Sequence, residues 1–102
     1  MEDKILKKIL EIDDDTYIIF FDYGCRYSEG ALDLLRKSDV KYKGYQIVDI
    51  EGGLTYLINV LKKHANDIDF TSDHNTKPVI FFNKKFIGGF TELDKLINTH
   101  QN

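Results

Sequence analysis

Cys25 is the only cysteine in this chain of 102 residues, and it is the side chain best suited to covalent chemistry. It follows Gly24 and is followed by Arg26. The thiolate is the reactive form of cysteine, and a helix N-terminus or a neighbouring positive charge favours it. Arg26 favours the thiolate, whereas Asp22 and Glu29 disfavour it. A lone cysteine can also be an inert buried apolar residue, so both interpretations stay open for this residue alone.

The segments on either side of Cys25 predict a strand, a turn and a helix. Residues 18–21 (IIFF) are rich in β-branched and aromatic side chains, which is typical of a strand buried on both faces. Ala31, Leu34 and Leu35 then repeat at helical spacing. We therefore expect the thiol at a helix start, where unpaired N–H groups and the positive end of the helix dipole lie.

Composition indicates one compact domain, residues 1–102, with a single hydrophobic core. The chain has 42% hydrophobic residues, 14 basic and 17 acidic residues, and a net charge of -3. This balance predicts no nucleic-acid partner, and no apolar run is long enough to predict a membrane partner. The three histidines lack ligand spacing, so no metal site is expected from them. A lone cysteine and an acidic N-terminus without a signal-peptide pattern predict a soluble, cytoplasmic protein.

The remaining patterns predict the order α-β-α-β-α-β-β-α. The second strand is expected to pair in parallel with the first through a right-handed crossover. We expect helices over 3–12, 26–38 and 54–65 and from Thr91 onward. Strands are expected over 16–21, 45–49, 79–82 and 85–87. Residues 66–77 should form a surface loop, and Asn83-Lys84 should form a tight turn.

This order resembles the thioredoxin fold, an α/β fold whose four-stranded mixed sheet is flanked by helices. The cysteine after the first strand and Pro78 before the third are part of the resemblance. Residues 76–81 (TKPVIF) resemble the Thr-Val-Pro segment of the glutaredoxin family, and residues 86–92 (FIGGFTE) resemble its Gly-Gly motif. The resemblance covers about residues 16–98, which is nearly the whole chain.

The resemblance implies a glutaredoxin-type, glutathione-dependent thiol-disulfide oxidoreductase with Cys25 as its catalytic residue. Glutathione would be the co-substrate, and glutathionylated or disulfide-containing proteins would be the partners of a monomeric enzyme. A cis bond before Pro78 would expose the backbone of Lys77 to the cysteinyl part of glutathione. The implied glutathione-binding residues are Tyr27, Lys77, Pro78, Gly89, Phe90, Thr91 and Glu92, with the γ-glutamyl carboxylate at the helix start and its ammonium at Glu92.

Three positions depart from the family pattern, and one of them is Arg26, which stands where proline or glycine is usual. Ser28 stands where many members have a second, resolving cysteine, so we expect a monothiol mechanism through Cys25. A native serine and a replaced cysteine both fit this position. Asp22 stands where many members have a lysine that holds the glycyl carboxylate of glutathione, and Lys77 or Arg26 is expected to provide that charge instead.

Two other functions stay open at this point. Resemblance to monothiol glutaredoxins allows a [2Fe–2S] carrier, in which two chains each give Cys25 and two glutathione molecules complete the four sulfur ligands. The chain is alternatively a redox-inactive, thioredoxin-like binding module. An unshifted, unreactive Cys25 would favour that last interpretation.

Overall fold

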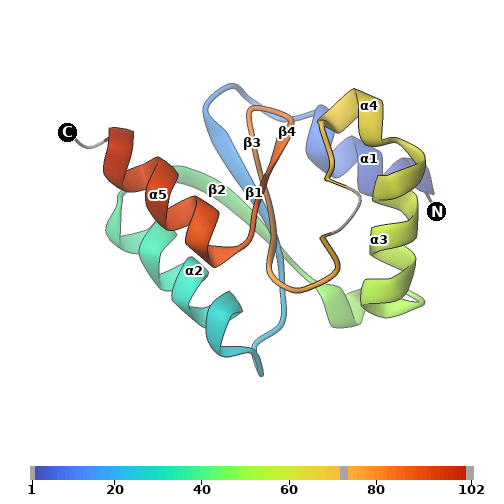
Figure 1. Ribbon diagram of the computed structural model, residues 1–102, viewed down its shortest axis with the longest axis horizontal. Coiled ribbons are helices and arrows are strands. Elements are labelled where there is room, and N and C mark those ends of the chain that lie inside the picture. Colours follow the sequence, from blue (N-terminus) through green and yellow to red (C-terminus); the bar gives the residue numbers. More distant parts are fainter. Residues whose placement is uncertain (1, 72–73, 101–102) are drawn as a thin grey trace.

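A sheet of four strands lies between two layers of helices in the computed structural model, which describes residues 2–71 and 74–100 (Figure 1). The described elements, in chain order, are α1 (Glu2–Leu10), β1 (Thr16–Phe21), α2 (Arg26–Lys37), β2 (Lys41–Gln46), the 3-10 helix η1 (Ile47–Asp49), α3 (Gly53–Lys63), α4 (Ala65–Ile68), β3 (Val79–Phe82), β4 (Lys85–Gly88) and α5 (Phe90–His100).

The strand order in the sheet is β2-β1-β3-β4. The central strand β1 pairs in parallel with β2 and antiparallel with β3, and β3 pairs antiparallel with β4. All six residues of β1 are buried, because helices cover both faces of the sheet at this strand. The fold is the thioredoxin-like α/β fold expected from the sequence.

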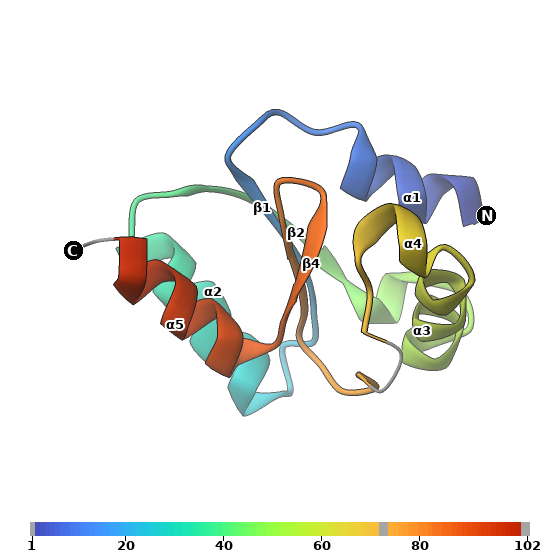
Figure 2. The same ribbon diagram turned by 45° about the horizontal axis from the view of Figure 1, so that its top comes forward.

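The sheet separates two apolar clusters. Figure 2 shows the helices that contribute to them, with α2 and α5 on one side of the strands and α1, α3 and α4 on the other. Ile18 and Phe20 of β1 pack with residues of α1, α3 and α4 on one face. Tyr17, Ile19 and Phe21 pack with residues of α2 and α5 on the other face. Successive β1 side chains therefore alternate between the two clusters, as the period of a strand requires.

The second strand was predicted in the wrong place. It covers Lys41–Gln46 instead of 45–49, and residues 47–49 form η1. The register explains the difference, because Phe21 at the end of β1 pairs with Gln46 at the end of β2. Beyond that pair β2 has no strand to bond with, and Val48 is 76% exposed despite its high strand propensity.

The predicted loop over 66–77 was also partly wrong, because it contains most of the short helix α4. Ile68 and Phe70 are buried in the cluster formed with α1 and α3, and this burial stabilises a helical turn that has no clear periodicity in the sequence. The observed order of helices and strands is thus α-β-α-β-α-α-β-β-α within the described ranges.

The hairpin between β3 and β4 was predicted correctly. Asn83 and Lys84 both have positive φ angles, 50° and 71°, as tight two-residue hairpin turns require. The Asn83 amide oxygen accepts a hydrogen bond from the backbone N–H of Asp15, which ties this turn to the start of β1.

Among the helices of the described residues, none has the length and apolar character needed to cross a membrane.

Candidate active site

Cys25 is the N-cap residue of α2, directly after the turn that ends β1. Its backbone is extended, with φ -107° and ψ 123°. Its N–H donates to the Asp22 carbonyl at 3.0 Å, and its carbonyl accepts the Glu29 N–H at 3.0 Å. The thiol is partly exposed. This placement at a helix start is the one expected from the sequence.

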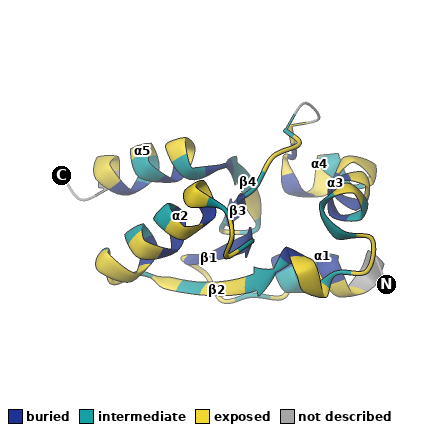
Figure 3. Ribbon diagram, turned by 90° about the horizontal axis from the view of Figure 1, so that it is seen from below, coloured by how far each residue is buried: buried dark blue, intermediate teal, exposed yellow. Residues whose placement is uncertain are grey.

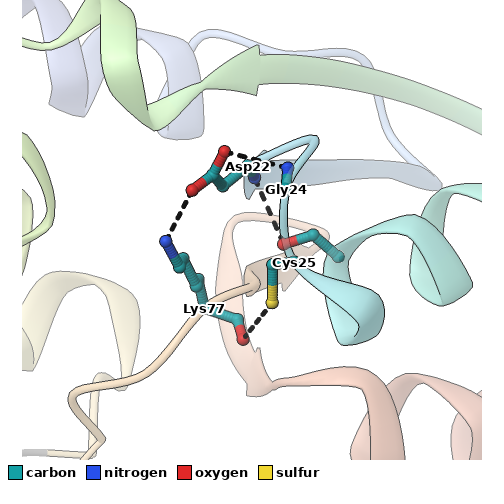
Figure 4. A network of polar contacts seen from close by, with 5 residues as sticks. Asp22, Gly24, Cys25 and Lys77 are labelled. Atoms are coloured by element: carbon teal, nitrogen blue, oxygen red, sulfur yellow. Dashed lines mark hydrogen bonds and ion pairs between the residues drawn. The ribbon is translucent and has the colours of Figure 1, made fainter.

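The segment before β3 lies across from this turn, as Figure 4 shows. The Lys77–Pro78 peptide bond is cis, which confirms the expectation from the family resemblance. The Cys25 thiol donates a hydrogen bond to the Lys77 carbonyl, with Sγ and O 3.8 Å apart. The fold therefore brings together two segments that are 52 residues apart in the sequence.

The surroundings of Cys25 lower the pKa of its thiol. Burial of the sulfur opposes ionisation, but the Ser28 N–H, the Ser28 hydroxyl, the Tyr27 N–H and the charge of Lys77 together outweigh it. Two of these groups are the first N–H groups of α2, which have no partner within the helix. The direction of the shift favours a reactive thiolate over an inert buried thiol.

Lys77 makes an ion pair with Asp22 at the mouth of the site, with Nζ and Oδ2 2.5 Å apart (Figure 4). The Lys77 hydrogen bond lowers the pKa of Asp22, and the Asp22 carboxylate in turn raises the pKa of Lys77. The other oxygen of Asp22 accepts the Gly24 N–H at 3.2 Å. Asp22 thus partly neutralises the cation that faces the thiol, a pairing that the sequence did not reveal.

Ser28 is fully buried and takes part in the network around the thiol. Its hydroxyl accepts the Asp22 N–H at 3.2 Å and also helps to lower the pKa of Cys25. From the sequence alone, Ser28 was expected only to stand in place of a resolving cysteine. The signal for its role was its position three residues after the N-cap, where a side chain can turn back to the helix start.

The Gly-Gly segment lies beside the Pro78 segment. A Cβ atom on Gly89 would lie 3.5 Å from the Pro78 carbonyl oxygen. Gly88 has φ +127°, and a Cβ there would lie 2.5 Å from Oε1 of Glu92. That carboxylate oxygen accepts the Gly89 N–H at 2.8 Å and so caps the start of α5. The capping contact was not part of the role expected for Glu92.

Phe90 connects the start of α5 with the start of α2. Its ring lies 6.5 Å from that of Tyr27, measured between centroids. Tyr27 is 60% exposed, and Thr91 is exposed at the start of α5. The predicted residues of the two helix starts and the Pro78 segment therefore gather around one region.

One predicted contributor lies apart from the polar network, and one residue was missed. Arg26 is exposed, and its side chain makes no ion pair or hydrogen bond with a described residue. His74 packs against the rings of Phe70 and Phe86, and its buried Nε2 has no hydrogen-bond partner among the described residues. The Cε1 atom of His74 would lie 3.7 Å from a Cβ atom on Gly89, so the His74 ring lies next to the Gly-Gly segment.

Among the described residues, no group of three or more His, Cys, Asp or Glu side chains is placed to hold a metal ion.

Comparison with curated proteins gives relatives that cover most of the chain. It is 39% identical over 94 residues to a probable glutaredoxin of Acanthamoeba polyphaga mimivirus, covering 92% of this chain and 89% of that protein. It is 36% identical over 80 residues to Glutaredoxin-1 of Vaccinia virus (strain Copenhagen), covering 78% and 69%. No family model matches the chain.

Solved structures show the same fold. The dithiolic glutaredoxin of Trypanosoma brucei brucei superposes with a TM-score of 0.71 at 23% identity, covering 95% of this chain and 89% of that one. A buckwheat glutaredoxin-glutathione complex superposes with a TM-score of 0.68 at 17% identity, covering 98% and 78%.

Proposed function

Because this chain belongs to the glutaredoxin family and is a glutaredoxin-type oxidoreductase, we propose that it reduces glutathione mixed disulfides by a monothiol mechanism through Cys25. The observation that carries the proposal is the lowered pKa of a partly exposed thiol at the start of α2. A lowered pKa also argues against the redox-inactive binding module considered above, since that interpretation required an unshifted thiol.

The reaction consists of two thiol-disulfide exchanges. The Cys25 thiolate attacks the glutathionyl sulfur of the substrate, the substrate's S–S bond breaks, and the substrate sulfur leaves as a thiolate that takes a proton from water. A glutathione thiolate then attacks the glutathionyl sulfur on Cys25. Oxidised glutathione leaves, and the Cys25 thiolate is restored. One half of the oxidised glutathione is the glutathionyl group from the substrate, and the other half is the single glutathione whose thiolate supplied the electron pair.

The monothiol route follows from the residues beside Cys25. Ser28 occupies the position from which a second thiol would attack a mixed disulfide, and a hydroxyl cannot form a disulfide. The chain has no other cysteine, so release of Cys25 requires an external thiol. The lack of a second thiol favours glutathione mixed disulfides as substrates over protein disulfides, whose reduction needs a resolving thiol within the enzyme.

Glutathione is proposed to lie across the two segments that face Cys25. Its cysteinyl backbone would pair with the backbone of Lys77 beside Pro78, as a short added strand. Its γ-glutamyl carboxylate would accept N–H groups at the start of α5, from Gly89, Phe90 and Thr91.

Two side chains would complete this glutathione site. The cap uses one Glu92 oxygen, and a carboxylate has further acceptor positions for the γ-glutamyl ammonium. The ring of Tyr27, exposed next to Cys25, would cover the disulfide. Glutathionylated proteins would be the partners of a monomer, and the lone thiol suits a reducing compartment such as the cytoplasm.

An iron-sulfur cluster is not part of this proposal. Such a cluster needs four ligands, of which this chain provides only the Cys25 thiolate. The other three ligands would come from a second chain and two glutathione molecules, and no observation on this chain favours that assembly. We therefore derive no step through a cluster.

The test is turnover of the mixed disulfide of glutathione and 2-mercaptoethanol with reduced glutathione as the reductant. Cys25→Ser is expected to abolish turnover, and mass spectrometry of the wild type after treatment with oxidised glutathione should show one glutathionyl group on Cys25. A thermal melt of Cys25→Ser checks that it is folded. Turnover that persists in a folded Cys25→Ser variant would overturn the proposal.

A further inference from the structure

A groove lined by lysines lies between α1 and the edge strand β2, outside the site described above. It consists of two adjoining hollows of about 590 and 310 Å³ that share Lys4, Lys8 and Tyr45. Lys7 and Lys43 line the smaller hollow. Figure 3 shows α1 next to the end of β2 and shows β2 as exposed or half-buried along most of its length. We call these two hollows the lysine groove.

The lysines of this groove have no carboxylate partner among the described side chains. Lys37, Lys77, Lys84 and Lys85, in contrast, each lie within 4.0 Å of an aspartate oxygen. Lys8 lies over the ring of Tyr45, with Nζ 5.1 Å from the centroid, so its contact is with an aromatic ring and not with a carboxylate. The groove is thus a local basic patch in a protein whose net charge is -3.

Acidic residues surround only part of the groove. Glu11 lines the smaller hollow, where it faces Lys4, Lys7, Lys8 and Lys43. Asp49 and Glu51 line the larger hollow, on the side of η1 and α3. The excess of positive charge therefore lies at the α1 end, and a ligand with acidic groups is attracted to that end.

The larger hollow leads to the turn that holds the thiol. Tyr23 lines this hollow, lies two residues before Cys25 and is 58% exposed. The Tyr23 ring packs against the Phe21 ring with centroids 4.9 Å apart, and this contact holds Tyr23 in place at the border of the hollow. Gly44, in β2, lines the same hollow, and the outer edge of β2 pairs with no described strand.

We propose that the lysine groove binds an acidic peptide segment of the protein substrate while the glutathionylated cysteine of that substrate reacts at Cys25. This inference rests on the proposed function. The unpaired lysines supply the charge complementarity, and the hollow that runs from Tyr23 to Lys8 supplies the connection to the thiol. The longest dimension of the protein is 37 Å, so about ten extended residues reach any point on it. The acidic residues should therefore lie within about ten positions of the substrate cysteine.

The experiment compares two glutathionylated peptides that differ only in a block of four residues, glutamate in one and glutamine in the other, placed four to ten residues from the cysteine. The wild type is expected to favour the glutamate peptide in kcat/KM by about tenfold at low salt, the combined size of a few surface charge interactions. The preference should shrink as salt is raised, because exposed charges are screened.

Two charge-matched variants separate the groove from net charge. Lys4→Glu/Lys8→Glu/Lys43→Glu is expected to remove or reverse the preference, whereas Lys37→Glu/Lys62→Glu/Lys95→Glu, with the same change in net charge, is expected to keep most of it. Turnover of the small glutathione-2-mercaptoethanol disulfide should be unchanged in both, which also shows that they are folded.

Equal kcat/KM for the two peptides in the wild type would overturn the inference, and the lysines would then only protect an exposed sheet edge. An equal loss of preference in both triple variants would overturn it as well. Binding of the glutamate peptide to the Cys25→Ser variant, measured by fluorescence anisotropy, tests the groove separately from turnover. If the wild type does not turn over the small disulfide, the proposed function is wrong. If Cys25→Ser nevertheless binds the glutamate peptide, and the three lysine substitutions of the groove abolish that binding, the groove is supported as a site for acidic peptides.

Discussion

The reactivity of Cys25 results from several weak contacts that oppose the cost of partial burial. Backbone N–H groups of α2, the Ser28 hydroxyl and the Lys77 charge all stabilise the thiolate, and its pKa is lowered. The thiolate also contributes to folding stability above the ordinary thiol pKa of about 8.5, and this contribution is lost as the pH falls through the lowered pKa.

The rate of alkylation of Cys25 by iodoacetamide should follow this lowered pKa. We expect the midpoint of the pH profile below about 8.5, because alkylation requires the thiolate. Lys77→Met should move the midpoint upward and slow alkylation at neutral pH by about two- to fivefold, the effect of one partly exposed charge.

Asp22→Asn should have the opposite effect, because Lys77 would no longer be neutralised by its partner. Lys85→Met is the matched control for Lys77→Met, since Lys85 also pairs with an aspartate, Asp69. It should leave the midpoint of the alkylation profile unchanged. An upward shift in the Asp22→Asn variant would contradict the role given to the ion pair.

Ser28→Cys should add a reaction that the wild type lacks. The fully buried Ser28 acts on Cys25 directly, so a thiol at this position is placed to attack a mixed disulfide on Cys25. We expect an internal disulfide after mild oxidation, measured by thiol titration and mass spectrometry, together with faster reduction of protein disulfides. Ser38→Cys, at the other end of α2, is the control and should form no such bond.

At the scale of elements, the site is built where three helix or strand starts converge. The starts of α2 and α5 and the segment before β3 belong to different parts of the chain, and the Phe90 and Tyr27 rings connect the two helix starts. Because the unpaired N–H groups of both helices lie at these starts, each helix contributes partial positive charge to the region.

Substitutions of Glu92 should separate its capping role from its proposed contact with glutathione. Glu92→Gln keeps an oxygen for the Gly89 N–H, so stability should change little while KM for glutathionylated substrate rises about two- to fivefold through loss of the charge. Glu92→Ala should in addition lose about 1 kcal/mol of stability, as removal of a helix cap does.

Both effects are measurable by steady-state kinetics and urea unfolding on the same preparations. An unchanged KM in a stable Glu92→Gln variant would leave Glu92 with the capping role alone.

At the scale of the whole molecule, two separate clusters on either face of β1 stabilise the fold. Leu35 of α2 belongs to one and Leu61 of α3 to the other, and both are fully buried. Leu35→Ala and Leu61→Ala should each lower the free energy of unfolding by about 2–5 kcal/mol, the cost of a cavity in a packed core.

Urea unfolding followed by circular dichroism measures both changes. Because the two residues share no cluster, the double variant should show the sum of the two losses within about 0.5 kcal/mol. A loss below about 1 kcal/mol in either single variant would show that its cluster is not tightly packed.

Several parts of this protein depend on short-range patterns and could be predicted from the sequence. The apolar run of β1, the turn at Gly24 and the helical spacing after Cys25 together placed the thiol at a helix start, and the Asn83-Lys84 turn placed the hairpin. Local periodicity and turn chemistry act over a few residues, so these features can be inferred from the sequence alone.

Contacts between residues that are far apart in the sequence depend on the folded arrangement of the elements. Asp22 and Lys77 are 55 positions apart, and their ion pair depends on the order of strands in the sheet. The end of β2 is set by its register with β1, and α4 is set by burial of Ile68. The lysine groove, likewise, forms because α1 packs beside the edge of β2. Such contacts depend on pairing and packing between segments, which no local pattern in the chain encodes.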